Sequence, residues 1–355
     1  MTMDLAELFG VAAPIVLGPF GGLSSVELTA GVSEQGGLGS YGLYGYDATR
    51  IAETVDAIRE RTGKPFALNL WVAHDEVQPG EVTPQQFAAY VAALEPFFRE
   101  VGMEPPAQPE RYLPSFDEQL EAVLDARPAV VSFVFGMPAP AFVDEARARG
   151  IMVVATATTV EEARALQAGG ADAVVATGAE AAGHRVSFLR RAEDSLVGTF
   201  PLVPQVVDAV SVPVIAAGGI ADRRGVRAAF ALGAAGVQVG TAFLVTRQSA
   251  INDAHRRAIQ EAPAHGTVLT RAMSGRLARG IPNRVVRSIE QSGVIAPFPV
   301  QNWLTGRFRA EATKQGLADL QSLWTGQAGP LARSTELTEV YAELRSGLPT
   351  ETGER

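Results

Sequence analysis

The strongest constraint on the fold is a repeated unit: a short apolar run, then a glycine-rich turn, then a helical pattern. The first unit combines the run Pro14 to Leu17, the turn Gly18 to Gly22, and a helical pattern capped by Ser24. Further runs open near residues 129, 151, 172, 213 and 236. The chain thus holds about eight units, the number that closes a parallel barrel. Valine- and alanine-rich runs also suit strands covered on both faces. We therefore predict an α/β fold, a (β/α)8 TIM barrel.

Two segments depart from this rhythm. Residues 74–115 are rich in proline and hold one predicted helix, Thr83 to Glu100. Beyond Arg247 the pattern is helical and more polar, with predicted helices from Phe308 to Trp324 and from Thr335 to Leu344. We expect both segments to form a smaller, mainly helical cap over one face of the barrel. The predicted domains are a barrel at 1–247 with the insertion 74–115, a cap region with C-terminal helices at 248–348, and a disordered tail at 349–355.

Composition limits the possible partners. A net charge of -9 and a pI near 5.1, with scattered basic residues, argue against binding of nucleic acid. The absence of cysteine excludes disulfides, thiolate metal sites and a cysteine nucleophile, and fits a reducing cytoplasm. The most apolar window, Pro128 to Val143, is interrupted by prolines and is shorter than the roughly 18 residues of a membrane span. We expect a cytoplasmic protein that acts on a small molecule; a homo-oligomer remains open.

Two glycine turns are candidates for binding an anion. Gly218-Gly219 and Gly240-Thr241 follow apolar runs at the face where such barrels carry their active sites. Glycine lets backbone N–H groups close around a phosphate, and the start of the following helix adds partial positive charge. The alternative is that these glycines only turn the chain. Because both loops share the pattern, we favour a phosphate-bearing cofactor or substrate.

A third glycine-rich stretch has a different interpretation. Gly37 to Gly42 formally matches the dinucleotide motif GxGxxG. A helix precedes it where the motif requires a strand, and no helix opens on its third glycine. We predict that this stretch is the second strand.

His184 is the candidate general base. It follows the run Ala173 to Ala176 in a glycine-rich loop at the same barrel face, and an imidazole titrates near neutral pH. The alternative is a loop histidine that hydrogen-bonds to backbone. No pair of His, Asp or Glu has metal-ligand spacing at the strand ends, so we expect no metal. The lysines, Lys64 and Lys314, lie away from the predicted site, which argues against a Schiff base.

Several segments together resemble the nitronate monooxygenases, formerly called 2-nitropropane dioxygenases. They are PIVLGPFGGLSSVELTAGVSEQGGLGSYG, ATGAEAAGHR, PVIAAGGIADRRGVRAAFALGAAGVQVGTAFL, SGRLARGIPN and LWTGQ. The resemblance implies a (β/α)8 barrel with a cap and noncovalently bound FMN, with His184 as the catalytic residue. It places FMN contacts at Gly18, Pro19, Phe20, Asn69, Thr177, Gly183, Gly218, Gly219, Gln238, Val239, Gly240 and Thr241. It places Ser274 and Ala182 at the substrate pocket.

Two positions depart from the family pattern. Thr177 stands where glutamine is usual, and Ala182 stands where a second glycine is usual. The methyl group of Ala182 would lie beside the flavin ring and could narrow the substrate pocket. No lysine is placed to stabilise reduced flavin, which leaves Asn69, Arg185 or a helix N-terminus for that role.

The activity implied by the resemblance is oxidation of alkyl nitronates or nitroalkanes by FMN and O2, with release of a carbonyl compound and nitrite. The family also includes flavin-dependent enoyl-acyl-carrier-protein reductases, which share the barrel and the histidine loop but use NAD(P)H. A reductase of that kind is the alternative enzyme. A flavin-binding barrel without catalytic activity is the alternative outside enzymology.

Overall fold

The computed structural model describes residues 4–73 and 81–349, and within them eight parallel strands form one sheet. Around the sheet the order is β1-β9-β8-β6-β5-β4-β3-β2, and a parallel bridge between Val16 and Leu38 joins its two edges. The strands are β1 (Ile15–Leu17), β2 (Gly39–Gly42), β3 (Phe66–Trp71), β4 (Val130–Val134), β5 (Met152–Ala157), β6 (Ala173–Thr177), β8 (Val214–Ala217) and β9 (Gly236–Val239). The predicted (β/α)8 barrel is confirmed, and the predicted strand at 37–42 is β2.

Alternating side chains along each strand divide the core into two parts. In β6, Ala173 and Val175 belong to an inner cluster with Val16, Leu38 and Ile215, which fills the barrel. The other set of β6 side chains packs in a separate, larger cluster with the surrounding helices. Strands buried on both faces explain why the sequence shows runs of Val and Ala rather than a polar alternation.

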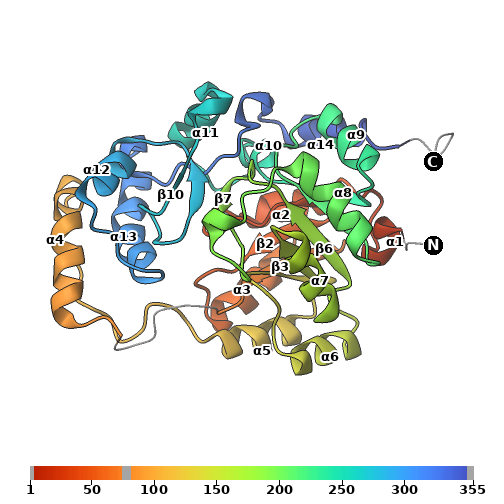
Figure 1. Ribbon diagram of the computed structural model, residues 1–355, viewed down its shortest axis with the longest axis horizontal. Coiled ribbons are helices and arrows are strands. Elements are labelled where there is room, and N and C mark those ends of the chain that lie inside the picture. The colour runs from red at the N-terminus through yellow and green to blue at the C-terminus, as the bar shows by residue number, and fades with distance from the viewer. Residues whose placement is uncertain (1–3, 74–80, 350–355) are drawn as a thin grey trace.

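Helices cover the outside of the barrel, each after its strand. They are α2 (Val26–Glu34), α3 (Ala48–Arg59), α5 (Phe116–Ala126), α6 (Pro140–Ala148), α7 (Val160–Ala168), α8 (Thr199–Ala209), α9 (Arg223–Ala231) and α10 (Thr241–Leu244). The short α1 (Leu5–Phe9) places Leu5 and Phe9 in the inner cluster. The C-terminal α14 (Leu337–Arg345) packs against α2 and α9, so it lies on the barrel (Figure 1). Asp222 caps α9 by accepting hydrogen bonds from the N–H groups of Arg224 and Gly225.

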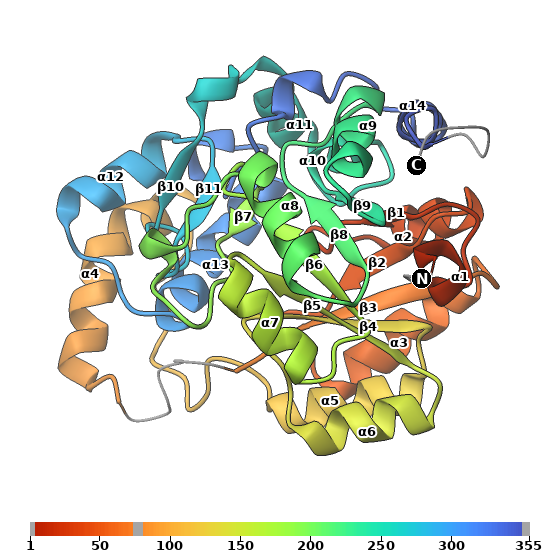
Figure 2. The same cartoon turned by 45° about the vertical axis from the view of Figure 1, so that its right-hand side comes forward.

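A second layer of helices has its own hydrophobic core. Phe87 and Phe98 of α4 (Pro84–Glu100) pack with Val286 of α12 (Arg284–Ser292) and with Leu304 and Phe308 of α13 (Val300–Lys314). Figures 1 and 2 show these helices together on one side of the molecule, away from α5, α6 and α7. The smaller helical cap predicted beside the barrel is therefore present. The predicted helix at 83–100 is confirmed as α4, which Thr83 and Gln86 begin with a capping box.

One predicted helix is wrong in its extent. The helix expected from Phe308 to Trp324 ends at Lys314, because Gly316 has a φ of +70° and turns the chain. After a 3-10 turn, η3 (Ala318–Leu320), residues 321–327 form no helix and reach the barrel, where the N–H of Gly326 donates to Oγ1 of Thr241. We call residues 321–327 the strap. The pattern beyond Lys314 that predicted a helix therefore belongs to a segment that contacts both the barrel and the cap but is not helical.

A small antiparallel sheet joins the two layers. It has the order β10 (Val268–Thr270), β11 (Ala278–Gly280) and β7 (Gly183–His184). The remaining elements are α11 (Asp253–Glu261), η1 (Ala192–Asp194), η2 (Ala264–Gly266) and η4 (Gly329–Leu331). Residues 74–80 of the predicted insertion, including His74, and 350–355 of the predicted tail lie outside the described residues. Within the described residues, no helix has the length and apolar character needed to span a bilayer.

Candidate active site

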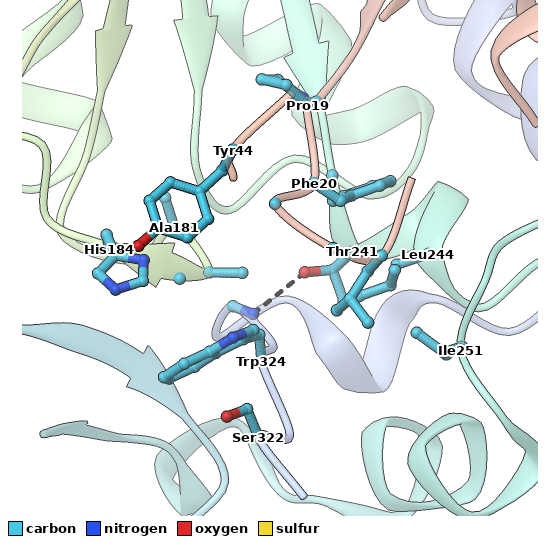
Figure 3. Close-up of a pocket in the computed structure, with 18 of the residues that line it drawn as sticks. Pro19, Phe20, Tyr44, Ala181, His184, Thr241, Leu244, Ile251, Ser322 and Trp324 are labelled. Atoms are coloured by element: carbon cyan, nitrogen blue, oxygen red, sulfur yellow. Dashed lines mark hydrogen bonds between the residues drawn. The ribbon is translucent and has the colours of Figure 1, made fainter. Parts of the chain in front are cut away.

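A cavity of about 450 Å³ lies where the barrel strands end and the cap begins. Most residues predicted for the site line it together, although they are far apart in sequence. These are Gly18, Pro19, Phe20, Asn69, Thr177, Ala182, Gly183, His184, Gly218, Gly219, Gln238, Gly240 and Thr241. Figure 3 shows Pro19, Phe20, His184 and Thr241 around the same space. The barrel gathers the ends of its strands at one face, as the pattern of turns predicted.

Two predicted residues contribute without lining the cavity. Val239 is fully buried, and its carbonyl accepts a hydrogen bond from the N–H of Gly18 at 2.8 Å. Ser274 is buried at 1% exposure, and its Oγ lies 2.8 Å from Nε2 of His184. Val239 therefore joins two turns of the cavity wall, and Ser274 acts behind the histidine.

The glycine turns depend on the absence of side chains. Gly218 and Gly219 have φ values of +100° and +74°, a region that disfavours other residues. A Cβ at Gly18 would lie 3.1 Å from Cα of Gly240, so the first and last turns of the barrel approach closely. Within the described chain, no acceptor pairs with the backbone N–H of Gly219 or Thr241. These N–H groups are available to an anionic ligand in the cavity.

A hydrogen-bond network supports the Gly218 turn from behind. Oγ1 of Thr199 lies 3.0 Å from the carbonyl of Gly218, and the Glu180 carboxylate accepts the N–H of Thr199. The backbone carbonyl of Glu180 also accepts a hydrogen bond from the N–H of Gln327. This bond connects the strap to the same loop. The turn is thus fixed by the barrel and by the strap before any ligand binds.

His184 is held by backbone pairing and by Ser274. It lies in β7 rather than in a free loop, and it pairs with Ala278 of β11. Oγ of Ser274 also lies 3.0 Å from the carbonyl of Arg276, which can only accept a hydrogen bond. When the Ser274 hydroxyl donates there, Nε2 of His184 carries the proton and donates to Ser274. Nδ1 is then the nitrogen that can accept a proton.

The imidazole is neutral at physiological pH. Burial, together with the positive charges of Arg276 and Arg309, lowers the pKa of His184 to about 3. The Arg276 guanidinium stacks between the rings of Phe135 and Phe298, at 4.2 and 4.0 Å from their centroids. His184 is therefore a neutral imidazole in an electropositive part of the cavity.

Arg309 brings a positive charge to the cavity from α13 in the cap. It donates to Oγ of Ser322 at 2.6 Å and to Oδ1 of Asn302 at 2.8 Å. Burial lowers its pKa to about 10, so it remains charged at neutral pH. No carboxylate lies within salt-bridge distance of Arg309 in the part of the chain that the structure describes. The cap wall therefore favours a ligand with negative charge.

Arg185, considered above for stabilising reduced flavin, does not line the cavity. Its side chain is 2% exposed and donates to the carbonyls of Thr177 at 3.1 Å and Gly178 at 2.7 Å. Arg279 likewise donates to the carbonyl of Ala179. The two guanidiniums fix the loop that leads to His184. Asn69 does line the cavity, with its amide nitrogen bound to Ser132.

Several lining residues were missed by the sequence reasoning. They are Tyr44, Trp71, Thr156, His255, Arg309 and Trp324. Trp71 and Thr156 stand at the ends of barrel strands, a position that could have identified them. Trp324 lies in the quoted LWTGQ segment, but a helix was expected there. His255 and Arg309 are cap residues, and nothing in their local sequence indicates that they face the barrel.

The described residues contain no group of three or more His, Asp or Glu placed to hold a metal ion. Apart from the carboxylate of Glu180, which accepts hydrogen bonds from Thr199, the polar atoms at the cavity come from backbone turns, hydroxyls, amides, imidazoles and guanidiniums. This donor set fits an organic ligand with an anionic group.

Comparisons with known proteins identify the family of this chain. The nitronate monooxygenase family profile matches residues 3–346. A nitronate monooxygenase of Pseudomonas aeruginosa is 41% identical over 97% of this chain and 98% of its own length. The nitroalkane oxidase structure from Streptomyces ansochromogenes has a TM-score of 0.85 at 35% identity, covering 97% of this chain and 99% of its own. FabK from Thermotoga maritima has a TM-score of 0.75 at 26% identity, covering 98% and 96%. The chain is an enzyme that belongs to the nitronate monooxygenase family.

Proposed function

We propose that the enzyme oxidises alkyl nitronates with O2, using noncovalently bound FMN, to carbonyl compounds and nitrite. The observation that carries the proposal is the placement of a neutral imidazole in the same cavity as two glycine turns with available N–H groups. A flavin phosphate at the turns would leave its ring directed toward His184. Family membership supports the same substrate class.

The residues present fit FMN. The N–H groups of Gly219 and Thr241 suit the phosphate, and Gly183 has no atom within 4 Å of an added Cβ, which leaves room for a flat ring. Asn69, Thr156 and Thr177 bring uncharged polar groups from three strand ends to the cavity. We propose that these three residues hold the polar edge of the ring in place of a lysine.

The chemistry that FMN supplies when bound is electron transfer from the nitronate to O2. The protein orients the substrate for it. Arg276 and Arg309 give the cavity a positive potential that attracts the nitronate anion. In the tautomer set by Ser274, Nε2 of His184 carries the proton. Nδ1 has no proton to donate and can only accept one.

The low pKa of His184 favours nitronates over their parent nitroalkanes. A base with a pKa of about 3 is poorly matched to a carbon acid that ionises near or above neutral pH. A nitronate has already lost that proton. We therefore expect a higher kcat/KM for a nitronate than for the corresponding nitroalkane at the same pH.

The enoyl reductase alternative has less support. Relatives at 41% and 35% identity bear names that refer to nitronates and nitroalkanes. The two hypotheses also predict different reductants. A nitronate monooxygenase should have its flavin reduced by a nitronate and not by NADH or NADPH, whereas an enoyl reductase should show the reverse.

The test combines a spectrum with an assay. Purified protein reconstituted with FMN is scanned for bound flavin, and nitrite release is then measured aerobically with ethyl nitronate and nitroethane. We expect a flavin spectrum, nitrite from ethyl nitronate, and a lower kcat/KM for nitroethane. Failure to bind FMN, or bound flavin with no nitrite release from any nitronate, would reject the proposal.

A further inference from the structure

We propose that Trp324 of the strap determines which nitronates reach His184, by limiting the size of the group attached to the reacting carbon. The inference rests on the proposed function and names a specificity residue for it. Trp324 lines the cavity, although it belongs to the cap core through its packing against the α4, α12 and α13 cluster. Trp324 thus connects the hydrophobic core of the cap to His184.

Two indoles flank the His184 imidazole. The ring centroid of Trp71 lies 4.9 Å from that of His184 at an interplanar angle of 71°, and Trp324 lies at 5.6 Å and 55°. Both indoles line the cavity. Figure 3 shows His184 and Trp324 facing the same space, with Tyr44 on the side away from Trp324. The part of the cavity beside His184 therefore forms a slot between these two rings, and under the proposal the reacting carbon of the substrate enters this slot.

The Trp71 side of this slot is rigid. Its indole lies 4.4 Å from Tyr44, 5.1 Å from Phe135 and 5.9 Å from Phe298, measured between ring centroids. Phe135 and Phe298 also enclose the Arg276 guanidinium. A larger substrate therefore cannot be accommodated by movement of Trp71 without breaking several aromatic contacts. The width of the slot is set on the other side, by Trp324.

Trp324 is positioned by contacts to the backbone of the strap. Nε2 of His255 lies 3.1 Å from the Trp324 carbonyl and must donate to it, because a carbonyl only accepts. Trp324 also forms an antiparallel bridge with Gly280 of β11. Two residues on, the N–H of Gly326 donates to Oγ1 of Thr241 at 3.1 Å, which Figure 3 marks with a dashed line.

Two glycines allow the strap to lie this close to the site. A Cβ at Gly280 would be 2.9 Å from Cε3 of the Trp324 indole, and one at Gly326 would be 2.8 Å from the carbonyl of Glu180. Side chains at either position would push the indole away from β11 or the strap away from the His184 loop. Trp324 can therefore lie close to the site because Gly280 in β11 and Gly326 in the strap have no side chains.

The test compares nitronates of different size. Trp324→Ala, Trp324→Phe and wild type are assayed for nitrite release with ethyl nitronate and cyclohexyl nitronate. We expect the ratio of kcat/KM for cyclohexyl nitronate to kcat/KM for ethyl nitronate to rise about tenfold in Trp324→Ala and less in Trp324→Phe. A tenfold change is at the lower end of the effect of one methylene group on discrimination in a hydrophobic pocket. Trp303→Ala is the control, because Trp303 packs under Arg307 in the cap and does not line the cavity.

His255 provides a second arm that tests positioning. His255→Met removes the donor to the Trp324 carbonyl and should raise the same ratio, whereas His255→Gln keeps an N–H donor and should restore the wild-type ratio. A ratio within twofold of wild type in Trp324→Ala and Trp324→Phe, with FMN still bound, would overturn the inference while leaving the proposed function intact. Absence of nitronate oxidation in the wild type would instead reject the proposed function and the inference together.

Discussion

The barrel mouth and the cap wall contribute to the site in different ways. The barrel supplies main-chain groups: the turns at Gly18 and Gly240 approach each other closely because both are glycine, and the N–H groups of Gly219 and Thr241 have no acceptor among the described residues. The cap supplies side chains, in particular Arg309 and Trp324, carried on a helix and on an irregular strap. His184 lies between the two and is held by β11 and Ser274. Under the proposed function, the barrel would bind the cofactor and the cap would select the substrate.

Replacement of the residue shared by both regions should have the largest effect. In His184→Asn we expect FMN to remain bound and the slower nitroalkane turnover, the part of the activity that requires a base, to fall at least about 100-fold. Nitrite release and the flavin spectrum are measured on the same preparation. Turnover at the wild-type rate would remove His184 from the chemistry.

A change in the barrel turns should weaken cofactor binding. In Gly219→Val the φ of +74° becomes strained, at a cost of about 1–3 kcal/mol, so we expect the Kd for FMN to rise about 5- to 150-fold. Gly102→Val is the matched control, because Gly102 has a φ of +75° with no atom near an added Cβ and lies outside the cavity lining. Equal Kd values for Gly219→Val and wild type, by fluorescence titration, would contradict a role of the Gly219 turn in binding FMN.

His255 in the cap should affect the stability of the protein in acid but not the binding of FMN at the barrel turns. Burial lowers the pKa of His255 from 6.5 to about 4, so the unfolded chain binds a proton below pH 6.5 that the folded protein does not. Stability is therefore lost as pH falls from about 6.5 toward 4. We expect His255→Gln to abolish about 2 kcal/mol of this loss at pH 5. Urea unfolding at pH 7.5 and pH 5 measures the difference; identical pH slopes would show that His255 is not buried in its neutral form.

The smallest expected effect concerns the orientation of His184. Ser274→Ala removes the acceptor of Nε2–H, worth about 1 kcal/mol, so we expect kcat to fall about fivefold with a changed pH profile. Ser274→Thr keeps the hydroxyl and should retain most of the activity. If Ser274→Ala leaves both kcat and the pH profile unchanged, the tautomer of His184 is set by another contact.

The same comparison explains what the sequence could predict. Barrel strands alternate between two buried clusters and are followed at once by glycine turns, so local pattern determines where Gly219, Thr241 and His184 come together. The cap has no such rule. Trp324 reaches the site because Gly280, Gly326 and His255 fix a non-helical strap, and these contacts join residues far apart in the chain. Arg185 was misread for a related reason: its neighbour His184 faces the cavity, but Arg185 itself bonds the carbonyls behind the loop.

The central claim is that the barrel turns hold a flavin beside His184, where a nitronate can reduce it. Anaerobic titration of the FMN-loaded protein, followed by flavin absorbance, tests this most directly. The account predicts bleaching by ethyl nitronate and an unchanged spectrum with NADH or NADPH. A protein that cannot be loaded with FMN, or a bound flavin bleached by nicotinamides and not by the nitronate, would contradict it.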